Sequence, residues 1–346
     1  MRAGFAPLPA APSEPLGPGG EPRFGAFSGS LDLVGLERAS RPGLAGALRT
    51  AAQEKRWLYL FAASDEAMVG AAIVEAGWFA AGFAWVLDRS LGAFAFDRSA
   101  AGLPGLNARM NDRPGVGARA RFSGLGLDVD VRRSGGRYEW TMVGRGGFRA
   151  ELALATAGAP APFVLVAPVT GPGIRITQKS GGLEASGSVK LGGRTLRLDG
   201  GTGGVDTTYG LLARETAWRW AFGTGRLPDG ERMAFNLAAG FGGVPAGDPG
   251  ENALFIGGGP VRLPPVRFAY DRSQPRSPWR VASADGSVDL AFAPAAVHRE
   301  VTRLVVLRTR FVQVAGTFAG RLPGPDGGAV EVAALPGVVE DHWAVW

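Results

Sequence analysis

Hydrophobic positions along the 346-residue chain fall into many short runs that alternate with polar or small residues. This period of two is typical of half-buried β-strands, and Gly, Asp or Ser residues bound most of the runs. In the first half, the runs predict strands over 57–62, 67–75, 78–87, 91–97, 117–132, 137–143, 146–155 and 161–168. The alternation therefore predicts an all-β protein.

The second half continues the same pattern, and three of its strand pairs carry hairpin-turn residues, Gly192-Gly193, Pro228-Asp229-Gly230 and Asp285-Gly286. We interpret "VTGPGIRITQKSGGL", residues 169–183, as a crossover between two halves of similar strand count. That count suits two antiparallel β-barrel or sandwich domains packed side by side. We expect a flexible Pro/Gly-rich tail over 1–22, an N-terminal β domain over 23–170 and a C-terminal β domain over 171–346.

Two segments depart from the strand pattern. Over 41–56, Leu44 and Leu48 lie four residues apart behind Pro42, which predicts one short amphipathic helix. The apolar segment 68–88 has the length of a membrane span, but Glu75 lies near its middle and no Lys or Arg flanks its N-terminal end. Because Ala76-Gly77 can turn the chain, we predict a hairpin there and no transmembrane span.

Composition and charge exclude several classes of function. The chain has no Cys, which rules out thiolate metal sites and fits a reducing compartment. Its N-terminus lacks the apolar core of a secretory signal, so we expect a cytoplasmic protein. The net charge is +6, but the basic residues are scattered and no cluster is longer than Arg132-Arg133, so we expect no nucleic-acid partner. We also expect a monomer.

Motifs for cofactors and metals are missing from the sequence. No GxGxxG opens a helix, and neither GxxxxGK nor GxSxG occurs. His298 and His342 are the two histidines, and in a strand Glu340 and His342 face one way while Asp341 faces the other. We therefore expect no cofactor and no metal site.

The segment "RETAWRWAFGTGRLPDGERMAFNLAAG" predicts an aromatic hairpin. Thr216, Trp218, Trp220 and Phe222 share one face of its first strand, and a turn at 227–230 brings Trp220 and Phe222 roughly opposite Leu237 and Phe235. These rings are interpreted either as a packed barrel core or as the wall of a cavity for a flat or apolar ligand.

Polar residues near this hairpin are candidates for chemistry, and each has an ordinary alternative. Asp206 is a general acid if burial raises its pKa, or a residue that caps a turn. Glu251 is a base or an ion-pair partner of an arginine such as Arg214 or Arg219. Asn236 orients a ligand or bridges a strand edge. His342 relays protons or makes a surface or inter-domain hydrogen bond.

A family resemblance rests on the ordered segments "TQKSGGLEASGSV", "VDTTYGLLARETAWRWAFGTG", "DGERMAFNLAAG", "ENALFIGG", "WRVASADGSVDLAFAP", "QVAGTFAGRL" and "LPGVVEDHWAVW". With them, residues 172–346, and more loosely 55–100, resemble the uncharacterised bacterial domain-of-unknown-function family 2804.

More distantly, an Asp, an aromatic-Gly step, W-x-W and a DG hairpin resemble the carotenoid hydratase and AttH-like group. This resemblance implies two lipocalin-like β domains and a site for an apolar polyene or polyketide-like substrate. It also implies that an acid near the aromatic-Gly step protonates a double bond, and the matching residue here is Asp206. Tyr209 stands where the group has Trp, and Thr207 and Thr208 replace the group's His.

The leading hypothesis is that the protein binds a lipid-, polyene- or polyketide-like small molecule in a β-barrel cavity and transforms it by acid–base chemistry of the hydratase, isomerase or cyclase kind. The candidate catalytic residues are Asp206, Tyr209, Glu251 and His342, and the candidate ligand-binding residues are Arg214, Trp218, Trp220, Phe222, Asn236 and Asn252. Two alternatives stay open, a non-catalytic lipocalin-like carrier and a structural β module without a ligand.

Overall fold

A computed structural model describes residues 7–39, 43, 46, 50, 52–171, 173–242, 248, 250–303 and 307–346. Strands dominate these residues, and the named helical elements among them are two short 3-10 helices, η1 (Leu36–Ala39) and η2 (Arg145–Gly147). The all-β prediction is confirmed. Half of the residues of the helix predicted over 41–56 lie outside the described residues. Of the others, residues 46, 50, 52 and 53 are helical, whereas 54–56 already belong to strand β2 (Glu54–Ala63), so the predicted helix is wrong at its C-terminal end.

The first sheet runs from the N-terminal region to residue 211. Its strands within the described residues are β1 (Gly25–Ser28), β2 (Glu54–Ala63), β3 (Ala67–Ala76), β4 (Phe79–Asp88), β5 (Ala93–Gly102), β6 (Ala108–Met110), β7 (Arg119–Gly124), β8 (Leu127–Ser134), β9 (Arg137–Gly144), β10 (Arg149–Ala155), β11 (Phe163–Val169), β12 (Gly173–Leu191), β13 (Arg194–Arg197) and β14 (Gly201–Leu211). Their main order is β5-β4-β3-β2-β14-β12-β10-β9-β8-β7-β6, and β11 and β13 pair with β12.

The second sheet takes the rest of the chain. Its strands are β15 (Glu215–Arg226), β16 (Arg232–Ala239), β17 (Ala253–Ile256), β18 (Gly259–Arg262), β19 (Val266–Ala269), β20 (Trp279–Ser283), β21 (Asp289–Arg303), β22 (Arg308–Pro323) and β23 (Ala329–Val345). The order is β18-β17-β16-β15-β23-β22-β21-β20-β19, so the last strand of the chain lies next to the aromatic strand β15.

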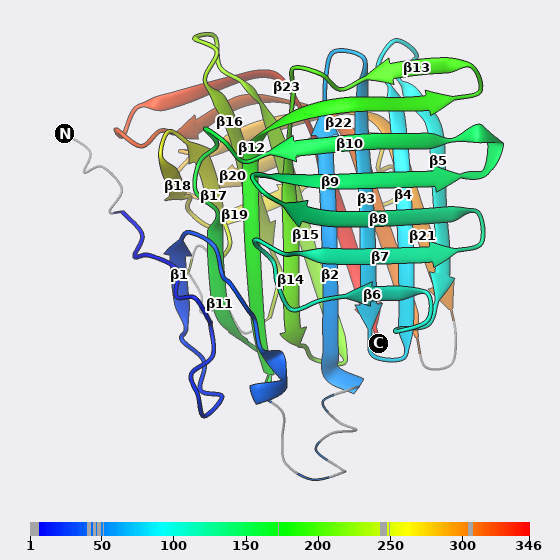
Figure 1. Ribbon diagram of the computed structural model, residues 1–346. Helices are drawn as coiled ribbons and strands as arrows, with labels where there is room; N and C mark the ends of the chain where they lie inside the picture. Colours follow the sequence, from blue (N-terminus) through cyan, green and yellow to red (C-terminus); the bar gives the residue numbers. More distant parts are fainter. Residues whose placement is uncertain are drawn as a thin grey trace.

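The molecule has three layers of strands (Figure 1). Strands β6 to β10 cross in front of β2 to β5 and β14, and the second sheet lies behind them. The first sheet thus folds over itself into a nearly closed barrel, and the second is a curled half-barrel. Apolar side chains fill three regions: the inside of the first sheet around Leu60 and Trp140, the space between the sheets around Phe61 and Trp220, and the inside of the second sheet around Trp279.

The middle layer explains the membrane-like segment. Residues 68–88 form the predicted hairpin, β3 and β4, and both faces of these strands are largely buried. One face packs inside the first sheet and the other against the second, so both must be apolar, as in strands covered on two sides. Within the described residues, no helix has the length and apolarity needed to cross a membrane.

Two sequence-based assignments in the first sheet are wrong. Residues 117–132 were expected as one strand, but the chain turns at Gly126, whose φ of 80° suits glycine, and forms the β7–β8 hairpin. The expected crossover at 169–183 is mostly strand β12, with a register irregularity between Ser180 and Leu183. The chain changes sheets at 212–214 instead. The division into domains 23–170 and 171–346 stays a prediction.

Candidate functional site

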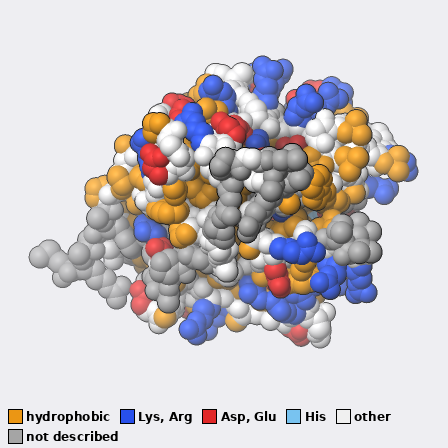
Figure 2. Space-filling model, turned by 90° about the horizontal axis from the view of Figure 1, so that it is seen from below, with side chains coloured by type: hydrophobic (Ala, Val, Ile, Leu, Met, Phe, Trp, Pro, Cys, Tyr) orange, Lys and Arg blue, Asp and Glu red, His pale blue; other side chains and the backbone are white. Residues whose placement is uncertain are grey.

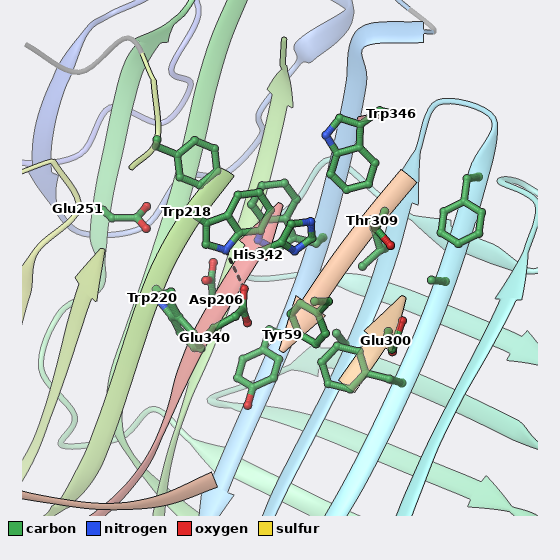
Figure 3. Close-up of a pocket in the computed structure, with 18 of the residues that line it drawn as sticks. Tyr59, Asp206, Trp218, Trp220, Glu251, Glu300, Thr309, Glu340, His342 and Trp346 are labelled. Atoms are coloured by element: carbon green, nitrogen blue, oxygen red, sulfur yellow. Dashed lines mark hydrogen bonds between the residues drawn. The ribbon is translucent and has the colours of Figure 1, made fainter. Parts of the chain in front are cut away.

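A cavity of about 110 Å³ lies between the two sheets. We call it the inter-sheet pocket (Figure 3). Its wall is mostly aromatic, and its residues include Trp57, Tyr59, Phe79, Phe83, Lys179, Asp206, Trp218, Trp220, Phe241, Glu251, Glu300, Phe311, Glu340, His342 and Trp346. The hypothesis placed the cavity inside a β-barrel. The structure places it outside the interior of either sheet, because the aromatic face of β15 points toward the first sheet.

The aromatic strand β15 has the alternation that the sequence predicted, but its partner is shifted by one residue. Trp220 lies opposite Ala238 and Phe222 opposite Asn236, rather than opposite Leu237 and Phe235. A shift of one residue moves every side chain of a strand to the other face. Phe235 and Leu237 therefore pack inside the second sheet, while small or polar residues of β16 face the pocket side.

Aromatic stacking fixes the outer part of the pocket. The Trp218 ring stacks on His342, Phe241 and Trp57, with centroid separations of 3.9, 4.8 and 5.5 Å. Trp220 meets Tyr59 edge-on at 5.4 Å. These contacts join rings from both sheets, so an apolar guest in the pocket would touch both.

The inner end of the pocket is polar because two cross-strand rows face each other. In the first sheet, neighbouring strands place Lys179 opposite Asp206, and Asp206 opposite Tyr59. In the second sheet, Gln313 lies opposite Glu340, which lies opposite Trp220. Directly opposed side chains on one face of a sheet lie close together, so each row delivers its polar groups to one place.

Glu340 is a carboxyl group whose pKa the site shifts toward neutral pH. It is buried, its Oε1 accepts a hydrogen bond of 2.7 Å from Trp218 Nε1, and its Oε2 accepts one of 3.0 Å from Gln313 Nε2. Burial raises the pKa of Glu340 to about 7, with a smaller contribution from the nearby Asp206 charge and opposed by the two hydrogen bonds. Near neutral pH it can therefore give or take a proton.

Asp206 belongs to a buried ion network. Its Oδ2 contacts Lys179 Nζ, which lies 3.7 Å from Glu251 Oε2, and Arg175 Nη1 donates to that same Glu251 oxygen at 3.2 Å. The Arg175 guanidinium also lies 4.0 Å from the Phe241 ring centre. Burial raises the pKa of Asp206, and the Lys179 ammonium opposes this shift. Its Oδ1 is buried without a hydrogen-bond partner among the described residues.

His342 is held as a neutral ring. It lies between Trp218 and Phe311, whose ring centre is 5.5 Å away, and neither ring nitrogen has a partner among the described residues. Burial lowers the pKa of His342 to about 3. It therefore stays uncharged at neutral pH.

At the seam between the sheets, His298 of β21 contacts β5, an edge strand of the first sheet. Its Nδ1 lies 2.6 Å from Asp97 Oδ1 and its Nε2 lies 2.9 Å from Glu300 Oε1. Burial alone would lower the pKa of His298, but the hydrogen bonds and charges of Asp97 and Glu300 outweigh it and raise the pKa to about 9. The ring also stacks on Phe83 of the pocket wall at 4.8 Å.

The other candidate residues lie outside this constellation. Tyr209 lies three residues from Asp206 and so on the opposite face of β14, where its hydroxyl donates to Asn111 O at 3.0 Å. Asn236 supports the pocket from behind, because it accepts a hydrogen bond of 2.7 Å from Trp220 Nε1. Phe222 packs between the sheets, Asn252 bonds the backbone of Ala238 and Pro264, and Arg214 is exposed.

The sequence profile described as "Domain of unknown function (DUF2804)" matches residues 25–346. The chain belongs to this family. A search among curated proteins finds no match.

Two solved structures with TM-scores of 0.50 or above share the overall fold of this DUF2804 member. A protein of Nitrosomonas europaea described as an AttH shares 13% identity at a TM-score of 0.54, covering 83% of this chain and 92% of that one. CghA in complex with Sch210972 shares 11% identity at a TM-score of 0.50, with coverages of 85% and 88%. Kievitone hydratase from Nectria haematococca shares 14% identity at a TM-score of 0.44, with coverages of 84% and 88%. At these identities the likeness shows the fold alone.

Sequence reasoning missed several groups that shape the site in this family member. Lys179 lies in a segment that was interpreted as a crossover, and Gln313 and Tyr59 lie within ordinary strand patterns. One signal in the sequence could have identified these groups, namely a polar residue on the apolar face of a strand. Lys179, Gln313 and Glu340 all occupy such positions. Among the described residues, no group of three or more His, Asp or Glu side chains is placed to hold a metal ion.

Proposed function

We propose that the protein binds a small apolar molecule in the inter-sheet pocket and acts on it by acid–base chemistry. The carrying observation is that one pocket combines a mostly aromatic wall, half-buried at Trp57, Phe79 and Trp346, with the buried carboxyl groups of Glu340 and Asp206. Apolar pockets with a few convergent polar groups of shifted pKa are typical of ligand-binding and catalytic sites.

Two carboxyl groups with different environments supply the acid and the base. Glu340, with a pKa of about 7, is the proton donor. Asp206, whose carboxyl group contacts the Lys179 ammonium, is the acceptor. In the hydration of a double bond, Glu340 gives its proton to one carbon. Asp206 takes a proton from the water that adds to the other carbon.

The size of the pocket limits the ligand. About 110 Å³ is less than the ~300 Å³ at which drug-sized sites begin. The pocket therefore fits a short apolar compound, or one end of a longer one whose remainder lies in the mouth near Trp346 and Phe79. The bound Sch210972 in CghA, a protein of the same fold, supports a small-molecule ligand over a purely structural role.

The test combines binding and turnover for short unsaturated compounds such as geraniol and β-ionone. Binding is followed by tryptophan fluorescence, and hydrated or isomerised products by gas chromatography with mass detection. Glu340→Gln should lower turnover by about 10²–10⁴-fold while leaving affinity nearly unchanged, because it removes the proton donor but keeps the shape.

A matched control is Asp341→Asn, which changes the next residue on the opposite face of β23, where it pairs with Arg219, Arg272 and Arg310. This variant should keep its turnover. Binding without any product identifies a carrier and refutes the catalytic part of the proposal. Failure of native mass spectrometry and fluorescence to detect any apolar ligand refutes all of it.

A further inference from the structure

Four large hydrophobic side chains are exposed in the turns around one corner of the first sheet. Trp78, in the β3–β4 turn, is 67% exposed, Leu103 is 55% exposed and Leu106 is 78% exposed. Leu125, in the β7–β8 turn, is 84% exposed. Single exposed apolar residues are common, but a group of them marks an interaction surface.

The strand register places these turns side by side. Ala80 pairs with Gly102, so the turn that carries Trp78 lies beside the one that begins at Leu103. Glu75 accepts a hydrogen bond of 3.0 Å from Met110 N, which holds β6 against the end of β3. Asn107 Nδ2 donates to Ser123 O at 2.8 Å, which brings the β7–β8 turn to the same corner.

Arginines of β6, β7 and β8 border this corner. Arg109 lies directly opposite Arg121, and Arg119 directly opposite Arg132. All four are exposed and line one groove together with Leu106. Glu139 forms an ion pair with Arg132, and Asp130 lies opposite Arg121 in the same groove. Arg109 and Arg119 have no ion-pair partner among the described residues, and their charges favour an anionic partner. Seen from below, basic and hydrophobic side chains lie next to one another on the right of the molecule (Figure 2).

We propose that this corner, defined by Trp78, Leu103, Leu106, Leu125 and the four arginines, docks on the surface of an anionic phospholipid membrane. Exposed indole and leucine side chains suit the boundary between headgroups and acyl chains, and arginines attract anionic headgroups. An acidic protein would match the arginines but not the protruding apolar turns. Phe79, next to Trp78, lines the mouth of the inter-sheet pocket, so docking brings that mouth to an apolar reservoir.

The test is co-sedimentation of the full chain with empty phosphatidylcholine vesicles, with and without phosphatidylglycerol, at low and high salt. It needs no pocket ligand, so its outcome is independent of the proposed function. The protein should bind the anionic vesicles and leave them at high salt. Arg109→Gln with Arg121→Gln should weaken this binding by roughly 25-fold, about fivefold for each arginine. Trp78→Ser with Leu106→Ser should weaken binding to the same anionic vesicles and remove a blue shift in tryptophan emission.

Matched controls carry the same changes elsewhere. Leu91→Ser alters an exposed leucine in the β4–β5 turn, at the other end of those strands, and Arg267→Gln with Arg321→Gln removes two exposed arginines from the second sheet. These variants should bind vesicles like the unaltered protein. Circular dichroism confirms that all variants are folded. Absence of binding to anionic vesicles, equal binding to neutral ones, or equal losses in the controls overturns the proposal.

Discussion

Replacing Glu340 by Gln tests the electrostatics of the site without a ligand. In the folded protein burial raises the pKa of this carboxyl to about 7 from a usual 4.5, so the folded state holds the proton more tightly than the unfolded chain does. Above pH 4.5 the unfolded chain releases the proton first, and Glu340 therefore lowers the free energy of unfolding as the pH rises toward 7. Below pH 4.5 the carboxyl is protonated in both the folded and the unfolded state, so Glu340 no longer lowers the free energy of unfolding.

The change in the free energy of unfolding can be calculated from the difference between the folded and unfolded pKa values of Glu340. Between about pH 5 and pH 8, Glu340 should remove roughly 2–3 kcal/mol from the free energy of unfolding, since one pKa unit corresponds to about 1.4 kcal/mol. Gln cannot ionise, but its amide can accept from only one of Trp218 and Gln313, so the variant loses about 1 kcal/mol at every pH. Glu340→Gln should thus be less stable than the original protein near pH 4 and more stable near pH 8.

Urea denaturation followed by tryptophan fluorescence at the two pH values measures this crossover. The difference between variant and original protein isolates Glu340 from the other titrating groups. Asp341→Asn serves as the control and should lose stability at both pH values, because it breaks ion pairs with three arginines. If Glu340→Gln differed from the original protein by the same free energy of unfolding at both pH values, the claim that burial raises the pKa of Glu340 would be refuted.

Two further predictions concern the surroundings of the pocket. Asn236→Ala should lower the free energy of unfolding by about 1–3 kcal/mol, because it leaves the buried Trp220 Nε1 without its acceptor; a loss under about 0.5 kcal/mol in urea denaturation would contradict this role. His298, with a pKa raised to about 9, contributes stability that is complete below its usual pKa of 6.5 and is lost as the pH rises through 9. Thermal unfolding from pH 6 to pH 10 should show this decline, His298→Asn should flatten it, and an unchanged slope would argue against the Asp97–His298–Glu300 seam.

The alternation of apolar and polar residues predicted most strands well, but it did not predict which strands pair with one another or in which register. The alternation in β15 placed Trp218, Trp220 and Phe222 on one face correctly. The loop after it has five residues, 227–231, closed by a hydrogen bond of 2.8 Å from Leu227 N to Glu231 O, whereas the sequence suggested a turn at 227–230. That one residue decided which face of β16 meets the pocket.

The candidate site depended on contacts that no local pattern contains. Asp206 and His342 were expected to be functional, and both line the pocket. Lys179 meets Asp206 because β12 pairs with β14, and Glu340 meets the first sheet because the last strand is inserted beside β15. Sheet order of this kind arises from the packing of the whole chain. The sequence was sufficient to predict that Tyr209 and Asp206 lie apart, because two residues at an odd spacing in a strand point to opposite faces.

A crystal structure of the protein with a bound apolar compound, either co-purified or added as geraniol, tests the central claim most directly. The account predicts ligand density between the sheets, in contact with Trp218 and His342 and within hydrogen-bond reach of Glu340 or Asp206. Density inside either sheet's own interior, or a pocket filled by repacked rings under saturating ligand, would contradict it.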